Sequence, residues 1–332
     1  MKHACKGLFL MVPLLLAFTV SAHAAGNVTT SIESVTKQTA VVSVQNTVTS
    51  ITARSSMVMG FSGGGGFHNP GSTPRGGVNS GNNGDGIGVW VMGNAYWLDK
   101  SGSDNYSGDL YMLTGGFDKR FDDLLLGISF GGEWLDLGLE RDGKYKSTGF
   151  TIAPYVSYLL RDDVMLDFSV GYSSLSNDVR GWNDNTGAMS EGDYNSWRLY
   201  GATGATKTWE YDAWRFSSRL GALYLHQSTR GFDLRSPGGL VPTPIEGSDY
   251  NLFQMQLGGR AGYDFGDFIP FVGVTYFQDI AKTGGSDDMV GADFDLGLNW
   301  NNGPSTIGVI GTYGVREDFQ KIGGMLSFRY EF

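Results

Sequence analysis

Residues 164–176, VMLDFSVGYSSLS, alternate between apolar and polar side chains. The even-numbered positions from Val164 to Tyr172 are all apolar, and Asp167, Ser169 and Gly171 stand between them. A repeat of two residues is typical of a β-strand, because successive side chains of a strand point to opposite faces. This stretch is therefore predicted to be a strand with one apolar face and one polar face.

The same repeat runs through most of the chain from residue 87 onward, for example in 124–138, 251–265 and 290–300. Turns placed where Gly, Asn, Asp and Pro cluster leave strands of about 14 residues, whereas strands of soluble β-sandwiches average about 5–6. Twelve strands are predicted: 87–98, 109–120, 124–138, 147–160, 164–177, 194–209, 213–230, 249–265, 269–281, 289–301, 305–316 and 319–332.

The predicted connections alternate in length. The short connections have three residues each: 121–123, 161–163, 210–212, 266–268 and 302–304. Most of the others are longer and polar: 99–108, 139–146, 178–193, 231–248 and 282–288, with 317–318 as the short exception. Outer-membrane barrels have this asymmetry, with short periplasmic turns, longer extracellular loops and an even number of strands. We therefore predict an all-β fold, a twelve-stranded antiparallel transmembrane β-barrel in the bacterial outer membrane and in contact with its lipid.

Composition agrees with a β protein. Gly is 51 of 332 residues, about double the usual share of about 7%, and aromatic residues are 13%. So much Gly disfavours a helical protein, because each Gly inside a helix costs about 1 kcal/mol relative to Ala. Lys and Arg number 24 against 34 Asp and Glu, which excludes a nucleic-acid binder, since binding phosphates requires a basic surface.

The first 24 residues are predicted to be a signal peptide for the Sec export machinery. Lys2 and Lys6 precede an apolar stretch, 7–20, and residues 22–24, AHA, form an A-x-A-like cleavage site. The apolar stretch is shorter than the roughly 20 residues that a membrane-spanning helix needs. Cys5, the one cysteine, lies in this peptide, so the mature chain is expected to lack disulfides, zinc–thiolate sites and cysteine nucleophiles.

Residues 25–59 are a candidate for a helix that threads the pore. Val28, Ile32, Val35, Thr39 and Val42 follow helical spacing, and thirty helical residues would extend about 45 Å, more than an apolar band of about 25 Å. The many β-branched residues equally favour a strand, so both alternatives stay open. Residues 60–86 are rich in Gly, Pro, Ser and Asn and are predicted to be a linker. The barrel is predicted over 87–332.

If the apolar side of each strand faces lipid, charged side chains of both signs face the lumen. They are Glu133, Asp167, Arg198, Arg215, Arg219, Arg260, Asp293, Asp295, Lys321 and Arg329. Such a mixture does not form the one-sign ring of a strongly selective channel. Two interpretations remain: a hydrated lumen whose charges pair with one another, or a polar surface that surrounds a segment threaded through the pore.

The carboxyl end, 325–332, MLSFRYEF, carries Leu326, Phe328, Tyr330 and Phe332 on one face. The order of signal peptide, candidate helix, twelve strands and this aromatic ending resembles the monomeric autotransporters, or type V secretion proteins. The resemblance implies a translocator barrel with a helix in its pore, and it implies that the four aligned residues are a signal for the barrel-assembly machinery. Autotransporters usually carry a large passenger before the barrel, whereas only residues 25 to about 60 precede the linker here. The passenger is therefore expected to be very short or missing.

The alternative function is a free-standing porin or structural barrel, and the position of residues 28–57 distinguishes the two. No enzyme is predicted. Beyond the signal peptide only His68 and His226 are present, and no G-x-S-x-G motif accompanies them. No cofactor or metal site is predicted either, and the barrel is expected to be a monomer.

Overall fold

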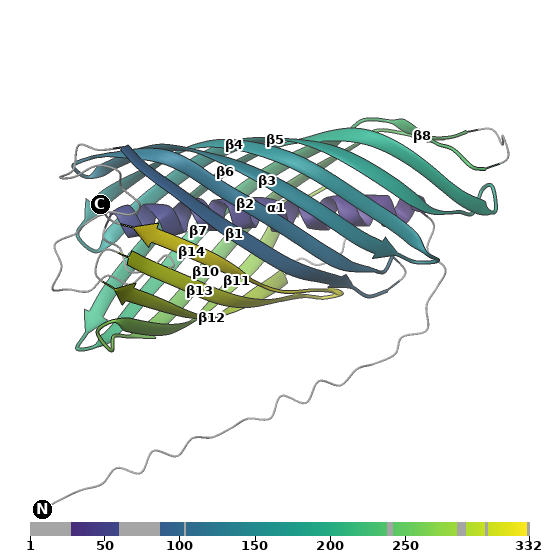
Figure 1. The fold of residues 1–332 in the computed structure, drawn as a ribbon. Coiled ribbons are helices and arrows are strands. Elements are labelled where there is room, and N and C mark those ends of the chain that lie inside the picture. Colours follow the sequence, from purple (N-terminus) through teal and green to yellow (C-terminus); the bar gives the residue numbers. More distant parts are fainter. Residues whose placement is uncertain are drawn as a thin grey trace, which may run out of the picture.

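The computed structural model describes residues 28–59, 87–102, 104–237, 242–283, 290–302 and 305–330. Within them, twelve long strands form a closed antiparallel barrel around one helix, α1 (Val28–Val58), and a short hairpin is formed by β8 (Phe232–Leu234) and β9 (Thr243–Ile245) (Figure 1). The predicted signal peptide 1–24 and linker 60–86 lie outside the described residues. Among the residues described, no helix is both long and apolar enough to cross a bilayer.

The prediction of a twelve-stranded barrel is confirmed. The barrel strands are β1 (Ile87–Lys100), β2 (Tyr106–Phe121), β3 (Leu124–Leu139), β4 (Gly143–Arg161), β5 (Val164–Asn183), β6 (Ala188–Tyr211), β7 (Trp214–Thr229), β10 (Ser248–Tyr263), β11 (Phe268–Lys282), β12 (Val290–Asn302), β13 (Ser305–Arg316) and β14 (Phe319–Tyr330). Each strand pairs with the next along the barrel, and β14 pairs with β1 to close it. Closure removes the unpaired strand edges that a bilayer would not tolerate.

The two ends of the barrel differ. At one end, named here the turn end, tight turns such as Asp122–Asp123 connect β2 to β3, and Asp122 adopts a left-handed φ of 50°. At the other end, named the loop end, the hairpin β8–β9 lies beside β6 and is joined to it by a bridge between Glu191 and Arg235. Figure 1 shows that β3 to β6 extend well beyond β12 to β14 at the loop end.

The prediction of a long loop over 178–193 is wrong. β5 continues to Asn183 and β6 begins at Ala188, so the two strands stay paired and only 184–187 connect them. The outward side chains here are polar, as Asp178 and Asp193 are, but the inward ones include Val179 and Tyr194, which are buried. Backbone hydrogen bonds between two strands form whether or not the outer side chains are apolar. Where water replaces lipid, a paired strand can therefore carry polar outward side chains. The predicted loops 99–108 and 139–146 are shortened for the same reason.

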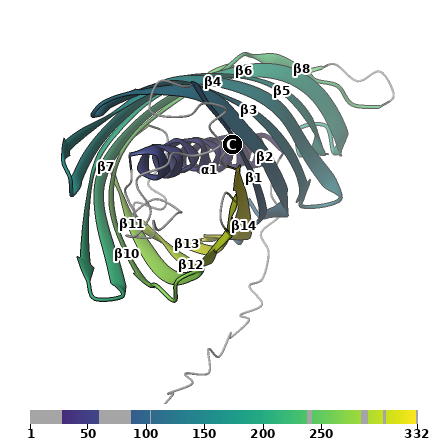
Figure 2. The same cartoon turned by 60° about the vertical axis from the view of Figure 1, so that its left-hand side comes forward.

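Helix α1 lies inside the barrel (Figure 2). It starts at the loop end, where Val28 lies against Gly181, and ends at the turn end, where Arg120 Nη1 donates a hydrogen bond to the carbonyl oxygen of Val58 over 3.1 Å. A strand alone in the lumen would leave its backbone groups unpaired, whereas a helix satisfies them internally. The hydroxyls of Thr39 and Thr47 also bond within the helix, to the carbonyls of Val35 and Ser43.

Two aromatic rows mark the membrane-spanning part of the barrel. Trp97, Tyr111 and Trp134 face outward toward the loop end, and Tyr158 and Trp209 are among those facing outward at the turn end. From Leu124 to Trp134 β3 extends ten residues, about 33 Å of strand, which a tilt of about 40° reduces to about 25 Å along the membrane normal. This height matches the apolar band of an outer-membrane barrel. We call this part the membrane zone.

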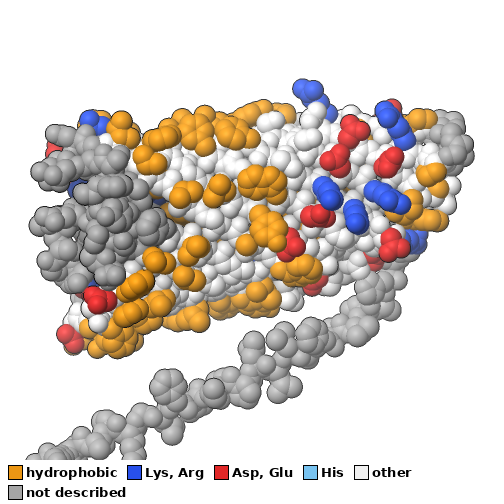
Figure 3. Space-filling model, in the orientation of Figure 1, with side chains coloured by type: hydrophobic (Ala, Val, Ile, Leu, Met, Phe, Trp, Pro, Cys, Tyr) orange, Lys and Arg blue, Asp and Glu red, His pale blue; other side chains and the backbone are white. Residues whose placement is uncertain are grey.

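Beyond the membrane zone the polarity of the strands reverses. Asp136 faces outward, whereas Leu137 is 0% exposed and faces inward. We call this part the protruding wall; it comprises 135–139 of β3, 143–149 of β4, 174–183 of β5 and 188–196 of β6. Figure 3 shows charged side chains gathered toward the loop end and hydrophobic ones over the rest of this face. The condition used to assign the lumen residues, that the apolar side of a strand faces lipid, therefore does not hold in the protruding wall, where the apolar side faces inward.

Candidate functional site: the helix-filled lumen

A buried ion pair joins the helix to the barrel at the turn end. The Nε and Nη2 atoms of Arg54 donate to the two carboxylate oxygens of Asp118 over 2.6 and 2.7 Å, and both side chains are 2% exposed. The hydroxyl of Tyr155 donates to Asp118 over 2.8 Å, and Trp90 Nε1 donates to that hydroxyl over 3.0 Å. Every charge in this cluster therefore has a partner, which is the condition under which a buried ion pair is tolerated.

In the middle of the lumen the helix contacts the opposite wall through amides. Gln45 Nε2 donates to Gln254 Oε1 over 2.6 Å. Gln254 in turn donates to Asp279 over 2.7 Å, and Arg316 pairs with the same carboxylate at 3.4 Å. This chain of contacts links α1 to β10, β11 and β13.

Toward the loop end the contact becomes mainly apolar. Val28, Ile32, Val35 and Val42 pack in one cluster with inward side chains of the long strands, among them Leu98, Leu110, Leu135, Leu137 and Val179. One polar chain crosses this cluster: Tyr194 bonds to Thr36 at 3.3 Å and donates to the hydroxyl of Tyr145 at 3.1 Å. The half of the helix at the loop end is thus packed by apolar contacts, as in the core of a soluble protein.

The charged side chains predicted for the lumen are held mainly by one another. Arg198 on β6 reaches Glu133 on β3 at 2.9 Å, across two intervening strands. Arg219 makes two bonds to Asp167, one of them 2.8 Å long. The remaining pairs are Arg260 with Asp295 at 3.5 Å, Lys321 with Asp293 at 2.7 Å, and Arg215 with both Glu210 and Asp264. The side chain of Arg329 lies outside the described residues.

Glycines let these long side chains lie flat on the wall. A Cβ at Gly149 would stand 2.8 Å from Cγ of Glu133, and one at Gly204 would stand 2.3 Å from Nη2 of Arg219. Both distances are below what real Cβ contacts allow. Part of the high glycine content is therefore explained by the space that the ion pairs need beside the helix.

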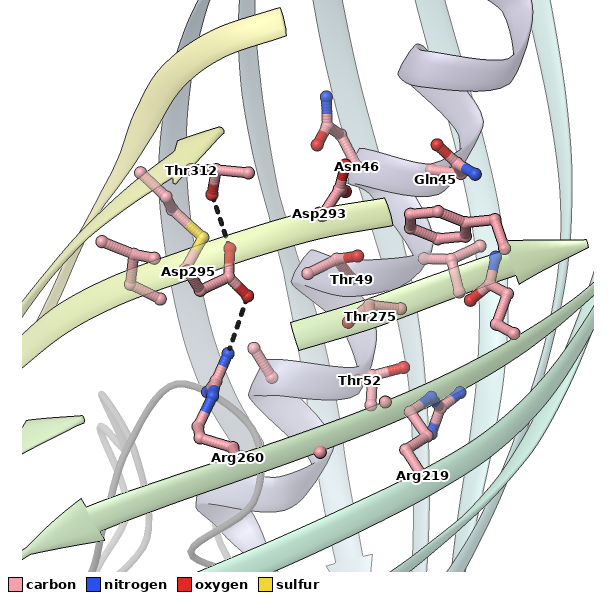
Figure 4. Close-up of a pocket in the computed structure, with 18 of the residues that line it drawn as sticks. Gln45, Asn46, Thr49, Thr52, Arg219, Arg260, Thr275, Asp293, Asp295 and Thr312 are labelled. Carbon is pink, nitrogen blue, oxygen red and sulfur yellow. Dashed lines mark hydrogen bonds and ion pairs between the residues drawn. The ribbon is translucent and has the colours of Figure 1, made fainter. Parts of the chain in front are cut away.

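The helix does not fill the lumen evenly. It packs mainly against β1 to β7, and a cavity of about 140 Å³ remains between it and the wall formed by β10 to β14. Figure 4 shows Thr49 and Thr52 of α1 on one side of this cavity and Arg260, Asp293 and Asp295 on the other. Thr312 donates to Asp295 over 2.8 Å. The cavity is polar and large enough for several water molecules.

Sequence reasoning did not single out Asp118, Gln254, Asp279 or Arg316 as lumen residues. In β2 both faces carry apolar residues, for example Leu110 inward and Tyr111 outward, so parity alone could not assign Asp118. Arg54 offered a signal, because it is the only Arg among residues 26–59. Among the described residues, no group of three or more His, Cys, Asp and Glu could hold a metal ion.

The residues predicted to be an assembly signal are only partly described. Leu326 faces outward and is 59% exposed, as a lipid-facing side chain would be. The backbone of Phe328 and Tyr330 belongs to β14, but their side chains, and all of Phe332, lie outside the described residues.

An apolar outer belt, a polar inner wall and an N-terminal helix through the pore define a plugged outer-membrane β-barrel. The model of the family described as "Autotransporter beta-domain" matches residues 89–318. The chain belongs to this family. It is an autotransporter translocator barrel of the bacterial outer membrane.

Solved structures share the fold. The translocator domain of the autotransporter NalP from Neisseria meningitidis superimposes with a TM-score of 0.65 at 11% identity, covering 76% of this chain and 90% of that one. The β domain of the Bordetella autotransporter BrkA gives 0.59 at 17%, covering 74% and 99%. The transport unit of AIDA-I from Escherichia coli gives 0.52 at 13%, covering 76% and 92%. No curated protein matches the sequence.

Proposed function

We propose that residues 25–59 of this translocator barrel remain in its lumen as a plug. They close the pore once the N-terminal end of the mature chain has passed through it. The observation that carries the proposal is the Arg54–Asp118 pair, a fully buried ion pair that joins the helix to the wall. The other described lumen pairs join one strand to another and do not need the helix, whereas Asp118 depends on Arg54 of the helix for its partner. The position of the helix within the lumen favours this function over a free-standing porin.

The loop end is proposed to face the outside of the cell. Short turns are periplasmic in outer-membrane barrels, and the protruding wall, with its polar outer face, requires an aqueous space beside the membrane. Since Val28 lies at the loop end, any segment joined to the helix before it would emerge at the cell surface. Protease added to intact cells is expected to cut within 231–247 and to spare the turn end. Cleavage at 161–163 would reverse the orientation.

Export and assembly complete the proposal. Residues 1–24 direct the chain through the Sec machinery, 60–86 link the plug to β1, and the barrel inserts as a monomer. The barrel-assembly machinery reads Leu326, Phe328, Tyr330 and Phe332. Deleting Phe332 removes about 2–3 kcal/mol of apolar burial at most, yet we expect little heat-modifiable barrel in the outer membrane. Wild-type amounts of folded barrel would contradict the recognition role.

We assign no catalytic step and no cofactor to the chain. His226 lies on the outer face of β7, where its Nδ1 is 2.8 Å from Asn251 Oδ1 and its ring lies 4.9 Å from that of Trp197. Neither neighbour is a nucleophile that this histidine could activate.

Single-channel conductance in planar bilayers tests the plug. Deleting 26–59 is expected to raise conductance several-fold, because a helix about 10 Å wide fills most of the lumen. A deletion within the linker, 61–84, which keeps the helix, is the control and should leave conductance low. Folding of both variants is checked by heat-modifiable migration. Equal conductance of the two deletions would favour the porin function instead.

A further inference from the structure

The outer face of the protruding wall carries a row of cations that are neighbours across the strands. Lys144 of β4 lies opposite Arg180 of β5, and Arg180 lies opposite Glu191 of β6. The bridge between Glu191 and Arg235 brings Arg235 to the end of the same row, through backbone bonds of 2.9 and 2.8 Å. The row therefore holds three cations and one carboxylate.

These three cations lack ion partners among the residues that the structure describes. Lys146, one step nearer the membrane, pairs with Asp136 at 3.1 Å, but no carboxylate of the described residues lies within 4.0 Å of Lys144, Arg180 or Arg235. Like charges directly opposite each other on a sheet are destabilising. The arrangement of Lys144 beside Arg180 thus has a cost that a bound anion would relieve.

The row borders a groove of about 310 Å³, which is also lined by Lys146, Asp178, Glu191 and Asp193. Because carboxylates share the groove, its net charge is small and it does not attract every polyanion. A ligand must place its negative groups beside the three cations. Phosphate groups fit this requirement, since Arg and Lys both bind them through charge-assisted hydrogen bonds.

The height of the groove identifies the source of the phosphate. Lys144 lies opposite Gly138 of β3, four residues beyond Trp134. This places Lys144 about 10 Å above the outer aromatic row along the membrane normal. The groove also faces sideways from the barrel, toward the headgroups of neighbouring lipids, and not along the pore axis. In the proposed orientation these headgroups belong to the outer leaflet.

We propose that this groove binds the phosphate groups of a phosphorylated glycolipid headgroup that stands beside the barrel in the outer leaflet. Arg180 and Lys144 contact one phosphate, and Arg235 holds the neighbouring part of the headgroup. Asp178 and Asp193 lie opposite each other in the adjacent row, so the phosphates are confined to the side of the groove that carries the three cations. The groove therefore fixes the lipid that borders the tallest part of the wall.

The test compares two triple variants of the full-length protein purified from its own membrane. Lys144→Gln/Arg180→Gln/Arg235→Gln removes the row, and Lys119→Gln/Arg161→Gln/Lys207→Gln makes the same change of charge at the turn end. Native mass spectrometry measures the glycolipid retained per barrel. We expect several-fold less in the groove variant and no change in the control. Equal retention by the two variants would overturn the proposal.

Added ligands distinguish the source of the phosphate. A bis-phosphorylated glycolipid should raise the melting temperature of the wild type more than its dephosphorylated form does, and this difference should vanish in the groove variant. Equal stabilisation by inorganic phosphate alone would show a soluble anion site and overturn the lipid assignment. If the triple variant does not fold, R180Q, which removes the central cation, decides by the same measurements. Conductance stays at the wild-type value in every case, so failure here leaves the plug proposal standing.

Discussion

The membrane zone and the protruding wall are built from the same strands and have opposite polarity. In β3 of the membrane zone, Leu126 faces outward and Glu133 faces inward; in the wall, Asp136 faces outward and Leu137 faces inward. The strand alternates throughout, and only the surroundings change. Lipid gives way to water outside, and an ion-paired lumen gives way to the apolar half of α1 inside. Alternation thus identifies a strand, but which face is apolar depends on the level that the strand has reached.

The largest effect is expected when the helix is studied outside the barrel, away from both the membrane zone and the protruding wall. Val, Ile and Thr make up about half of the 31 residues of α1. Summed propensities make such a helix roughly 8 kcal/mol less favourable than one of Ala. A peptide of residues 26–59 is therefore expected to show almost no helical circular dichroism in water. A strongly helical peptide would mean that the barrel merely receives a preformed helix.

The next effect concerns the ion pair of the membrane zone. Arg54→Ala leaves Asp118 buried without its partner, which costs about 3–5 kcal/mol. The helix should then lose its contact with the wall at the turn end, and the conductance should rise toward that of the deletion of 26–59.

The paired variant Arg54→Met/Asp118→Leu is the control, because it removes both charges and keeps apolar volume. It should conduct as little as the wild type, since replacing a whole buried pair is often neutral. If the single and double variants conduct alike, the unpaired carboxylate of Asp118 is not the cause of the raised conductance.

A smaller effect separates the inner faces of the two regions. Leu137→Ala opens a cavity in the apolar cluster of the wall and should cost about 2–4 kcal/mol. Hydrogen exchange of 143–149 should become faster. Conductance should stay low, because the Arg54–Asp118 pair lies at the other end of the barrel. Faster exchange at the turn end instead would show that the two regions do not respond separately.

The last comparison tests the outer boundary at Trp134 and contains the smallest effect. Asp136→Asn in the wall removes only an exposed pair with Lys146, worth about 0–1 kcal/mol. Ile128→Lys, near the middle of the membrane zone on β3, places a charge against lipid and should cost about 2–4 kcal/mol. Urea midpoints of the two variants in lipid vesicles measure the difference. Equal midpoints would place the bilayer boundary elsewhere.

The strands and the barrel could be predicted from the sequence because side-chain alternation is a local property. The stretch 164–176 shows it without reference to any neighbour, and long strands with short turns at one end then leave a closed sheet in a membrane as the solution. Charged residues in the apolar repeats could likewise be assigned to the lumen. Their partners could not, because Arg198 and Glu133 are separated by two strands and meet only after the sheet has curved.

The state of residues 28–58 was decided by the tertiary structure. Their β-branched sequence is compatible with a strand, but the centre of a closed barrel offers no strand edge to pair with, and helical hydrogen bonds are then the way to satisfy the backbone. The same holds for 178–193, whose polar residues suggested a loop. The sequence by itself determined a twelve-stranded outer-membrane barrel, because its repeats act over two residues. Only the tertiary structure decided where the polarity reverses and what fills the pore, because both depend on contacts between segments far apart in the chain.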